Sequence, residues 1–159
     1  MKKVEKFYEI SEQGEMLEPE WWKVLIGQDD ISKELKRIIG FSWIYDGIQH
    51  EKRYAYGISP KLVGNGEGIM VVEEESYQGA RNSLVFYEPD GRERFRIRPS
   101  GMVGKGRDGE EAYFYHPAYD RERRVWEVYY NSGECDYCEY IADLDIETGR
   151  LSNIRKTRF

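Results

Sequence analysis

The chain has 159 residues, the length of one domain with a single core. Its 14% aromatic residues argue against a disordered tail, and its 34% charged residues argue against a membrane-embedded protein. The net charge of −6 disfavours a nucleic acid as the main partner, because such binding draws most of its affinity from cations that neutralise phosphates.

The N-terminal segment, residues 1–16, carries the lysines of a signal peptide, but charged residues interrupt it before an apolar stretch can form. No other segment approaches the roughly 20 apolar residues that a membrane-spanning helix needs. We therefore expect neither secretion through an ordinary signal nor membrane insertion. A cytoplasmic protein, folded as one domain over residues 1–159, is the prediction.

Residues 29–40 carry the clearest helix pattern. Four apolar residues fall at i, i+4, i+7 and i+8, and so on one helix face: Ile31, Leu35, Ile38 and Ile39. Asp29 and Asp30 can cap the start, and Gly40 can take the left-handed conformation that ends many helices. A shorter helix could begin at Pro19, where a strand is nearly as plausible. The sequence thus predicts a helical part over about residues 18–40.

Residues 41–159 contain short runs rich in Val, Ile, Tyr, Phe and Trp, separated by Gly, Pro, Asn and Asp. Residues 89–91 (Pro-Asp-Gly) and 147–149 (Glu-Thr-Gly) suit tight hairpin turns, because glycine accepts the positive φ that these turns require. Short connections imply antiparallel neighbours. We predict an α+β fold, with one or two N-terminal helices packed on a twisted, mostly antiparallel sheet of six to eight strands.

Residues 104–109, Gly-Lys-Gly-Arg-Asp-Gly, fit the G-x-G-x-x-G pattern of dinucleotide-binding loops. That pattern holds a phosphate only where a helix begins after it. Here two carboxylates follow, and then a strand-like aromatic run that ends before Pro117. We interpret residues 104–109 as a solvated loop. Residues 64–68, which lack the Lys-Ser/Thr of a phosphate loop, are interpreted as a turn.

Cys135 and Cys138 are the only cysteines, and they could supply two of the four ligands that a structural zinc ion needs. His50 and His116 would have to complete the set from distant segments, or two chains would have to share four cysteines. A redox pair is a further alternative, although such pairs normally begin a helix. A turn with incidental cysteines is the simplest interpretation. Without a G-x-S-x-G or H-E-x-x-H motif, we predict no cofactor, no metal and no enzymatic activity.

Arg94, Arg96 and Arg98 alternate with two apolar residues and so share one face of a predicted strand. Three arginines in a row could grip phosphates while nearby tyrosines stack on bases, as in single-strand binders. The simpler interpretation is that they pair with acids on a neighbouring strand. These arginines are the candidate face for a small ligand or a nucleic acid.

Glu73, Glu74 and Glu75 form the densest acidic cluster, with Tyr77 close behind. A solvated strand end is one interpretation. The other is a docking surface for a cationic protein, since charge complementarity speeds association and selects the partner. Thirteen tyrosines and four tryptophans favour an interface modestly, because large rigid aromatics anchor interfaces. These four residues are the candidate partner-binding site.

The hairpin segments at residues 83–97 and 140–156, on a small acidic chain without a catalytic motif, resemble the small immunity proteins of bacterial toxin systems. These systems include contact-dependent growth inhibition and other polymorphic toxin-antitoxin pairs. The resemblance covers roughly the second half of the chain. It implies a cytoplasmic protein that binds a cognate toxin and blocks its active site or its access to substrate. Such toxins are often basic nucleases, which an acidic surface suits.

The main functional hypothesis is therefore a binding protein that neutralises a basic, nuclease-like toxin domain by stoichiometric complex formation. Protecting a cell in this way needs nanomolar affinity, about −12 kcal/mol. The alternative is a β domain that binds a small ligand or a single-stranded nucleic acid. An enzyme that uses two carboxylates is the third hypothesis, and no particular pair of acids is indicated.

Overall fold

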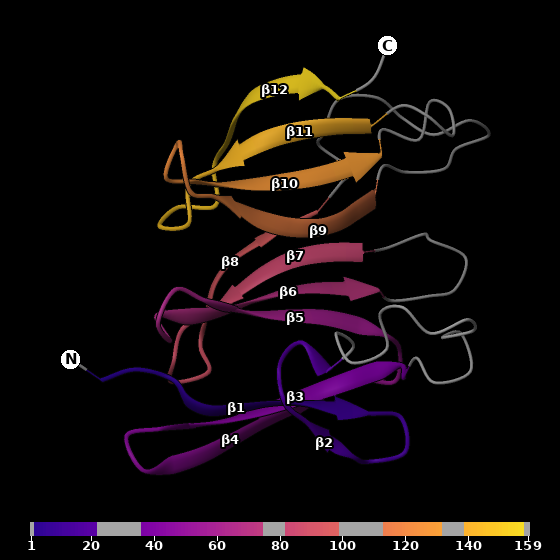
Figure 1. The fold of residues 1–159 in the computed structure, drawn as a ribbon, viewed down its shortest axis with the longest axis vertical. Coiled ribbons are helices and arrows are strands. Elements are labelled where there is room, and N and C mark those ends of the chain that lie inside the picture. The colour runs from indigo at the N-terminus through magenta and orange to yellow at the C-terminus, as the bar shows by residue number, and fades with distance from the viewer. Residues whose placement is uncertain (1, 22–35, 75–81, 99–112, 132–138, 158–159) are drawn as a thin grey trace.

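Residues 2–21, 36–74, 82–98, 113–131 and 139–157 are described by a computed structural model, which folds them into three four-stranded antiparallel sheets. The first sheet has the order β2-β1-β3-β4, with β1 Glu5–Ser11, β2 Met16–Leu17, β3 Ile38–Tyr45 and β4 Ile48–Arg53. The middle sheet has the order β5-β6-β7-β8, with β5 Ile58–Val63, β6 Gly68–Glu74, β7 Asn82–Tyr87 and β8 Glu93–Ile97. The third sheet has the order β12-β11-β10-β9, with β9 Tyr113–Asp120, β10 Val125–Asn131, β11 Glu139–Leu144 and β12 Leu151–Lys156. Figure 1 shows them stacked in chain order along the long axis.

The predicted α+β class is wrong, because the described residues contain no α-helix and form three sheets instead of one sheet of six to eight strands. Residues 38–40, the end of the predicted helix, begin β3, and residues 22–35 lie outside the described part of the chain. Gly40 does not end a helix. A Cβ on Gly40 would lie 2.6 Å from the Lys52 carbonyl oxygen of β4, so this glycine permits close contact between two strands.

The two central strands of the middle sheet are buried on both faces. In β6, Ile69 and Val71 belong to the core between the first and middle sheets, while Met70 and Val72 belong to the core between the middle and third sheets. All four side chains are at most 1% exposed. Burying each one contributes roughly 1.5–3 kcal/mol, so this sheet ties the three layers together.

Both predicted hairpin turns are confirmed. The turn at residues 89–91 joins β7 to β8, with Gly91 at φ +91°, and the turn at residues 147–149 joins β11 to β12, with Gly149 at φ +79°. Glycine adopts these positive φ values without the steric cost that other residues meet.

Residues 64–68 form the β5–β6 turn, as predicted. The Val4 backbone N–H donates a hydrogen bond to the Gly66 carbonyl oxygen at 2.8 Å. A Cβ at Gly66 would lie 2.6 Å from the Val4 carbonyl oxygen, so no larger residue fits between the turn and the N-terminal segment. The turn therefore fixes the N-terminal segment, and β1 after it, against the middle sheet.

Strand β9 continues through Pro117, where the sequence pattern suggested that it ends. Because β9 is an edge strand among the described strands, the missing N–H of proline is tolerated there. Pro117 is buried and faces the middle sheet from the third layer.

Candidate binding cleft

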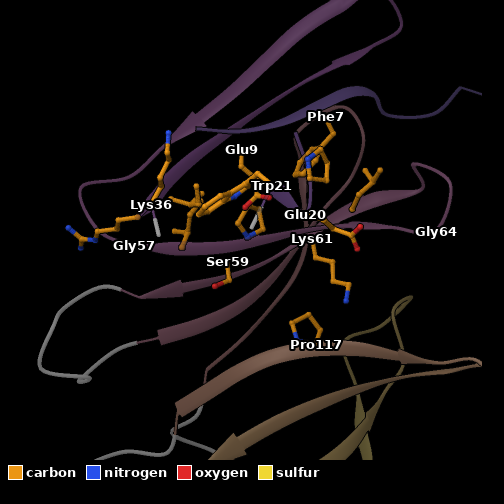
Figure 2. Close-up of a pocket in the computed structure, with 16 residues that line it drawn as sticks. Phe7, Glu9, Glu20, Trp21, Lys36, Gly57, Ser59, Lys61, Gly64 and Pro117 are labelled. Carbon is orange, nitrogen blue, oxygen red and sulfur yellow. The ribbon is translucent and has the colours of Figure 1, made fainter. Parts of the chain in front are cut away.

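A cleft of about 680 Å³ opens beside β5, the edge strand of the middle sheet among the described strands. Residues from all three sheets line it, including Phe7 and Glu9 of β1, Ile58 and Leu62 of β5, and Pro117 of β9 (Figure 2). Its volume falls in the range of roughly 300–1,000 Å³ that is common for ligand-binding sites.

The walls of the cleft are largely core side chains. Phe7 and Ile58 are buried in the core between the first two sheets, and Trp21 and Leu62 pack against that core. Pro60 contributes no backbone N–H to the open edge of β5, which discourages unspecific strand pairing there. The shape of the cleft is therefore set mainly by the packing of the sheets.

Glu9 places a carboxyl group on the core-facing side of β1. Side chains two residues apart share a face of a strand, so Glu9 points the same way as Phe7, and its cross-strand partner is Phe41. Burial raises the pKa of Glu9 to about 7, although the nearby Trp21 indole opposes the rise. The side chain therefore exchanges between its neutral and charged forms near neutral pH.

The Trp21 indole lies beside Glu9 in the cleft (Figure 2). Its Nε1 is buried and forms no hydrogen bond of ordinary geometry in the described part of the chain, although its interaction with Glu9 lowers the pKa of that carboxyl group. The cleft thus holds a buried donor next to a carboxyl group that is partly removed from water.

Three basic side chains line the described part of the cleft, and two of them form ion pairs with acidic residues outside it. Lys36 Nζ lies 2.5 Å from Glu15 Oε2, and Arg37 donates a hydrogen bond of 3.0 Å to Glu12 Oε2. The Lys61 ammonium lies over the Trp126 ring, 5.7 Å from its centroid. None of these cations forms an ion pair with Glu9.

Arg94 and Arg96, two of the three predicted ligand-face arginines, are occupied by carboxylates. Arg94 donates to both carboxylate oxygens of Glu88, at 2.6 and 2.9 Å. Arg96 lies 3.2 Å from Glu73 and 2.9 Å from Glu93. The simpler interpretation expected acids on the neighbouring strand, whereas Glu88 follows β7, Glu93 lies in β8 itself and Glu73 lies in β6. Arg98 is exposed and follows the end of β8.

Glu73 of the acidic cluster is 3% exposed and lies at the centre of a buried polar network. It accepts hydrogen bonds from Tyr87 at 3.2 Å and from Tyr56 at 3.5 Å, in addition to its contact with Arg96. Glu73 therefore anchors the end of β6, instead of facing solvent.

The structure describes less of the remaining members of the acidic cluster. Glu74 is the last residue of β6, while Glu75 and Tyr77 lie outside the described residues. Because two of the four residues lie outside the described part of the chain, a patch formed by all four cannot be described, and their docking role stays a prediction.

Of the candidate metal and nucleotide residues, the structure describes only His50 and His116. The His50 ring stacks on Trp43 with centroids 5.1 Å apart, and His116 lies in β9 opposite Tyr129. Cys135, Cys138 and residues 104–109 lie outside the described residues.

Within the described ranges, no group of three His, Cys, Asp or Glu side chains could hold a metal ion. No helix in those ranges is long and apolar enough to cross a membrane.

Sequence reasoning missed Glu9 and Trp21. The available signal was the period of two in residues 5–11, which places Glu9 on the same strand face as Phe7. A carboxylate on the strand face that carries the core residue Phe7 indicates either a functional group or a wrong strand face. Trp21 follows no comparable periodicity, so nothing marked it as part of a site.

The protein consists of stacked β-sheets with a largely apolar cleft that contains a partly buried carboxyl group. No family model matches the chain, and no curated protein does. Its fold is similar to that of a chain in the solved structure of Tne2 in complex with Tni2, with a TM-score of 0.70 and 13% sequence identity. The similarity covers 98% of this chain and 99% of that chain. At this identity it concerns the fold alone.

Proposed function

We propose that this protein neutralises a cognate toxin domain by forming a stoichiometric complex with it. The observation that carries the proposal is the fold, which matches almost end to end that of a chain solved as part of a two-protein complex. A neutralising protein and its target form a complex of this kind. The resemblance of the hairpin segments to immunity proteins supports the same function.

Inhibition by binding needs a preformed surface more than it needs reactive groups. The middle sheet is packed on both faces, so the layers form a rigid support. A rigid support lowers the free energy that is lost when surface groups become ordered on binding. The nanomolar affinity that neutralisation requires is easier to reach under these conditions.

The proposed partner is a basic, nuclease-like toxin domain that the protein meets in the cytoplasm. The net charge of −6 supports a basic partner, because opposite charges accelerate the encounter of two proteins. Glu74, Glu75 and Tyr77 remain the proposed docking residues in the acidic segment. Glu73 has a supporting role in this proposal, because it anchors the strand from which that segment continues.

The test is co-expression with the product of each neighbouring gene, followed by affinity capture and light scattering of the purified complex. We expect one basic protein whose toxicity disappears when this chain is present and which co-purifies at a ratio of one to one. An unrelated acidic protein of similar isoelectric point serves as the control for unspecific charge effects. Capture of a nucleic acid or a small molecule, with no protein partner, would contradict the proposal.

A further inference from the structure

The cleft beside β5 contains a partly buried carboxyl group, Glu9, for which the described part of the chain supplies no cation. We propose that it receives an arginine from a loop of the toxin, with the Glu9 carboxylate as the charge partner of the guanidinium group. This inference rests on the proposed function and names the chemistry by which the partner is held.

Glu9 forms no ion pair within the described part of the chain, and the donor beside it is the neutral Trp21 indole. Two of the basic residues that line the cleft, Lys36 and Arg37, are paired with Glu15 and Glu12. Lys61 is directed toward Pro117 and Trp126, away from Glu9 (Figure 2). A cation that pairs with Glu9 must therefore come from another molecule.

The lining favours arginine over lysine. A guanidinium group is planar, stacks on aromatic rings and stays charged when it loses water, whereas a buried lysine readily loses its proton. Phe7 and Trp21 supply aromatic surface next to Glu9. The guanidinium can also donate two parallel hydrogen bonds to one carboxylate, which adds geometric selectivity.

The volume of the cleft, about 680 Å³, leaves room for backbone around a single side chain, which favours a segment of chain over an isolated cation as the occupant. The arginine side chain has no hydrogen-bond acceptor, so a backbone carbonyl of that segment is the group that could accept a well-aligned hydrogen bond from Trp21 Nε1. A loop with an arginine at its tip supplies both groups.

Part of the cost of binding is already met in the free protein. Glu9 has lost much of its water, as the rise of its pKa to about 7 reflects. An incoming guanidinium therefore displaces less water from the carboxylate than it would at an exposed acid. The ionised form of Glu9 is the form that binds, so association releases a proton whenever the free side chain is protonated.

The experiment compares Glu9→Gln with Glu5→Gln in binding to the purified toxin, which is first made inactive. Glu5 is exposed at the start of the same strand, so its substitution removes the same charge outside the cleft. We expect Glu9→Gln to weaken binding about tenfold or more, mainly through faster dissociation, because a buried charge pair is lost. Glu5→Gln should change the affinity less than about twofold.

A pH series provides a second readout. The affinity of the native protein should rise as the pH increases from 6 to 8, and that of Glu9→Gln should lack this component. The other charged groups that line the cleft are Glu20, Lys36, Arg37 and Lys61, and all of them remain in the variant. The part of the pH dependence that Glu9→Gln removes therefore belongs to Glu9.

Replacement of each toxin arginine in turn, combined with Glu9→Gln in double-mutant cycles, identifies the occupant. Strong coupling to one arginine supports the inference. Coupling to a lysine, or equal affinities of the Glu9 and Glu5 variants for a toxin that the native protein binds, overturns it while the proposed function stands. If the native protein binds no toxin, both proposals fail.

Discussion

At the scale of single residues, the binding role proposed for Glu9 comes with a cost in stability. A carboxylate on the core-facing side of a strand is disfavoured when it is charged, and no cation in the described part of the chain compensates it. Glu73 shows the contrasting solution. It is more deeply buried, but Arg96 and two tyrosine hydroxyls satisfy it. The first group is available to a partner, and the second holds the fold together.

The raised pKa of Glu9 predicts how stability depends on pH. Between about 4.5 and 7 the folded state binds more protons at Glu9 than the unfolded state does, so this residue lowers the free energy of unfolding as the pH rises. Its cost is absent below that window and complete above it. We expect Glu9→Gln to be more stable than the native protein by about 2 kcal/mol at pH 8, after discounting for partial exposure.

Urea denaturation of the two proteins at pH 4 and pH 8 measures this effect. The difference in the free energy of unfolding should be small at pH 4 and large at pH 8. Taking the difference cancels the contributions of the other carboxylates, including Glu88, whose pKa the hydrogen bond from Arg94 lowers. A constant difference at both pH values would show that Glu9 is not desolvated in the folded state.

At the scale of elements, the hairpin turns join the layers as well as the strands. The turn at Gly149 packs directly on the middle sheet, since a Cβ there would lie 2.6 Å from the Phe95 ring of β8. Arg94 makes a second link by donating a 3.0 Å hydrogen bond to the Ile146 carbonyl oxygen before the same turn. The third sheet is therefore fixed to the middle sheet partly through one turn.

Gly149→Ala is expected to destabilise the protein by about 2–4 kcal/mol, because the methyl group meets Phe95 and the backbone has φ +79°. Gly91→Ala is the matched control. It has a similar φ of +91°, but its nearest neighbours, His50 and Trp43, would lie at 3.6 and 3.7 Å. That variant should lose only about 1 kcal/mol. Thermal and urea unfolding measure both, and equal losses would mean that Phe95 moves aside at no cost.

The sequence predicted the local pairs of strands better than their assembly. Turn chemistry at Gly91 and Gly149 was sufficient to place two hairpins, because a positive φ is a local requirement. The helix at residues 29–40 fails at its end because Ile38 and Ile39 satisfy a helical period as well as a strand buried on both faces. The contact of Gly40 with Lys52 is not visible from sequence spacing.

The sequence contained evidence for the number of sheet layers that the fold prediction did not use. The unbroken apolar runs of β6 and β7 indicate strands buried on both faces, and such strands need a layer on each side. Which strands supply those layers is a matter of long-range packing. The cleft depends on that packing, because Pro117 and Phe7 come from different sheets. Its position was therefore beyond prediction from the sequence, although the unusual place of Glu9 in its strand was not.

At the scale of the whole molecule, charge and shape have separate tasks in the proposed function. Three stacked sheets share two cores, and this packing favours a rigid body that loses little conformational freedom on binding. The net charge of −6 acts at longer range and affects the encounter with a basic partner. Substitutions in the cleft should thus change dissociation, while substitutions of exposed acids should change association.

Substitutions in the acidic segment give the sharpest test of the expectation that exposed acids control the rate of association. Glu73 must be left in place, because it is buried and its loss would remove the acceptor of Tyr87 and one of the two carboxylates that pair with Arg96. Replacing Glu74 and Glu75 with glutamine should slow association with a basic toxin several-fold at low salt and flatten its dependence on salt, with little effect on dissociation. The matched control replaces Glu5 and Glu122, two exposed acids elsewhere, and so removes the same charge. Stopped-flow association rates across a salt series separate the two cases. If both pairs slow association equally, the overall charge of the molecule steers the encounter. A larger effect at Glu74 and Glu75 places the docking face at the end of β6.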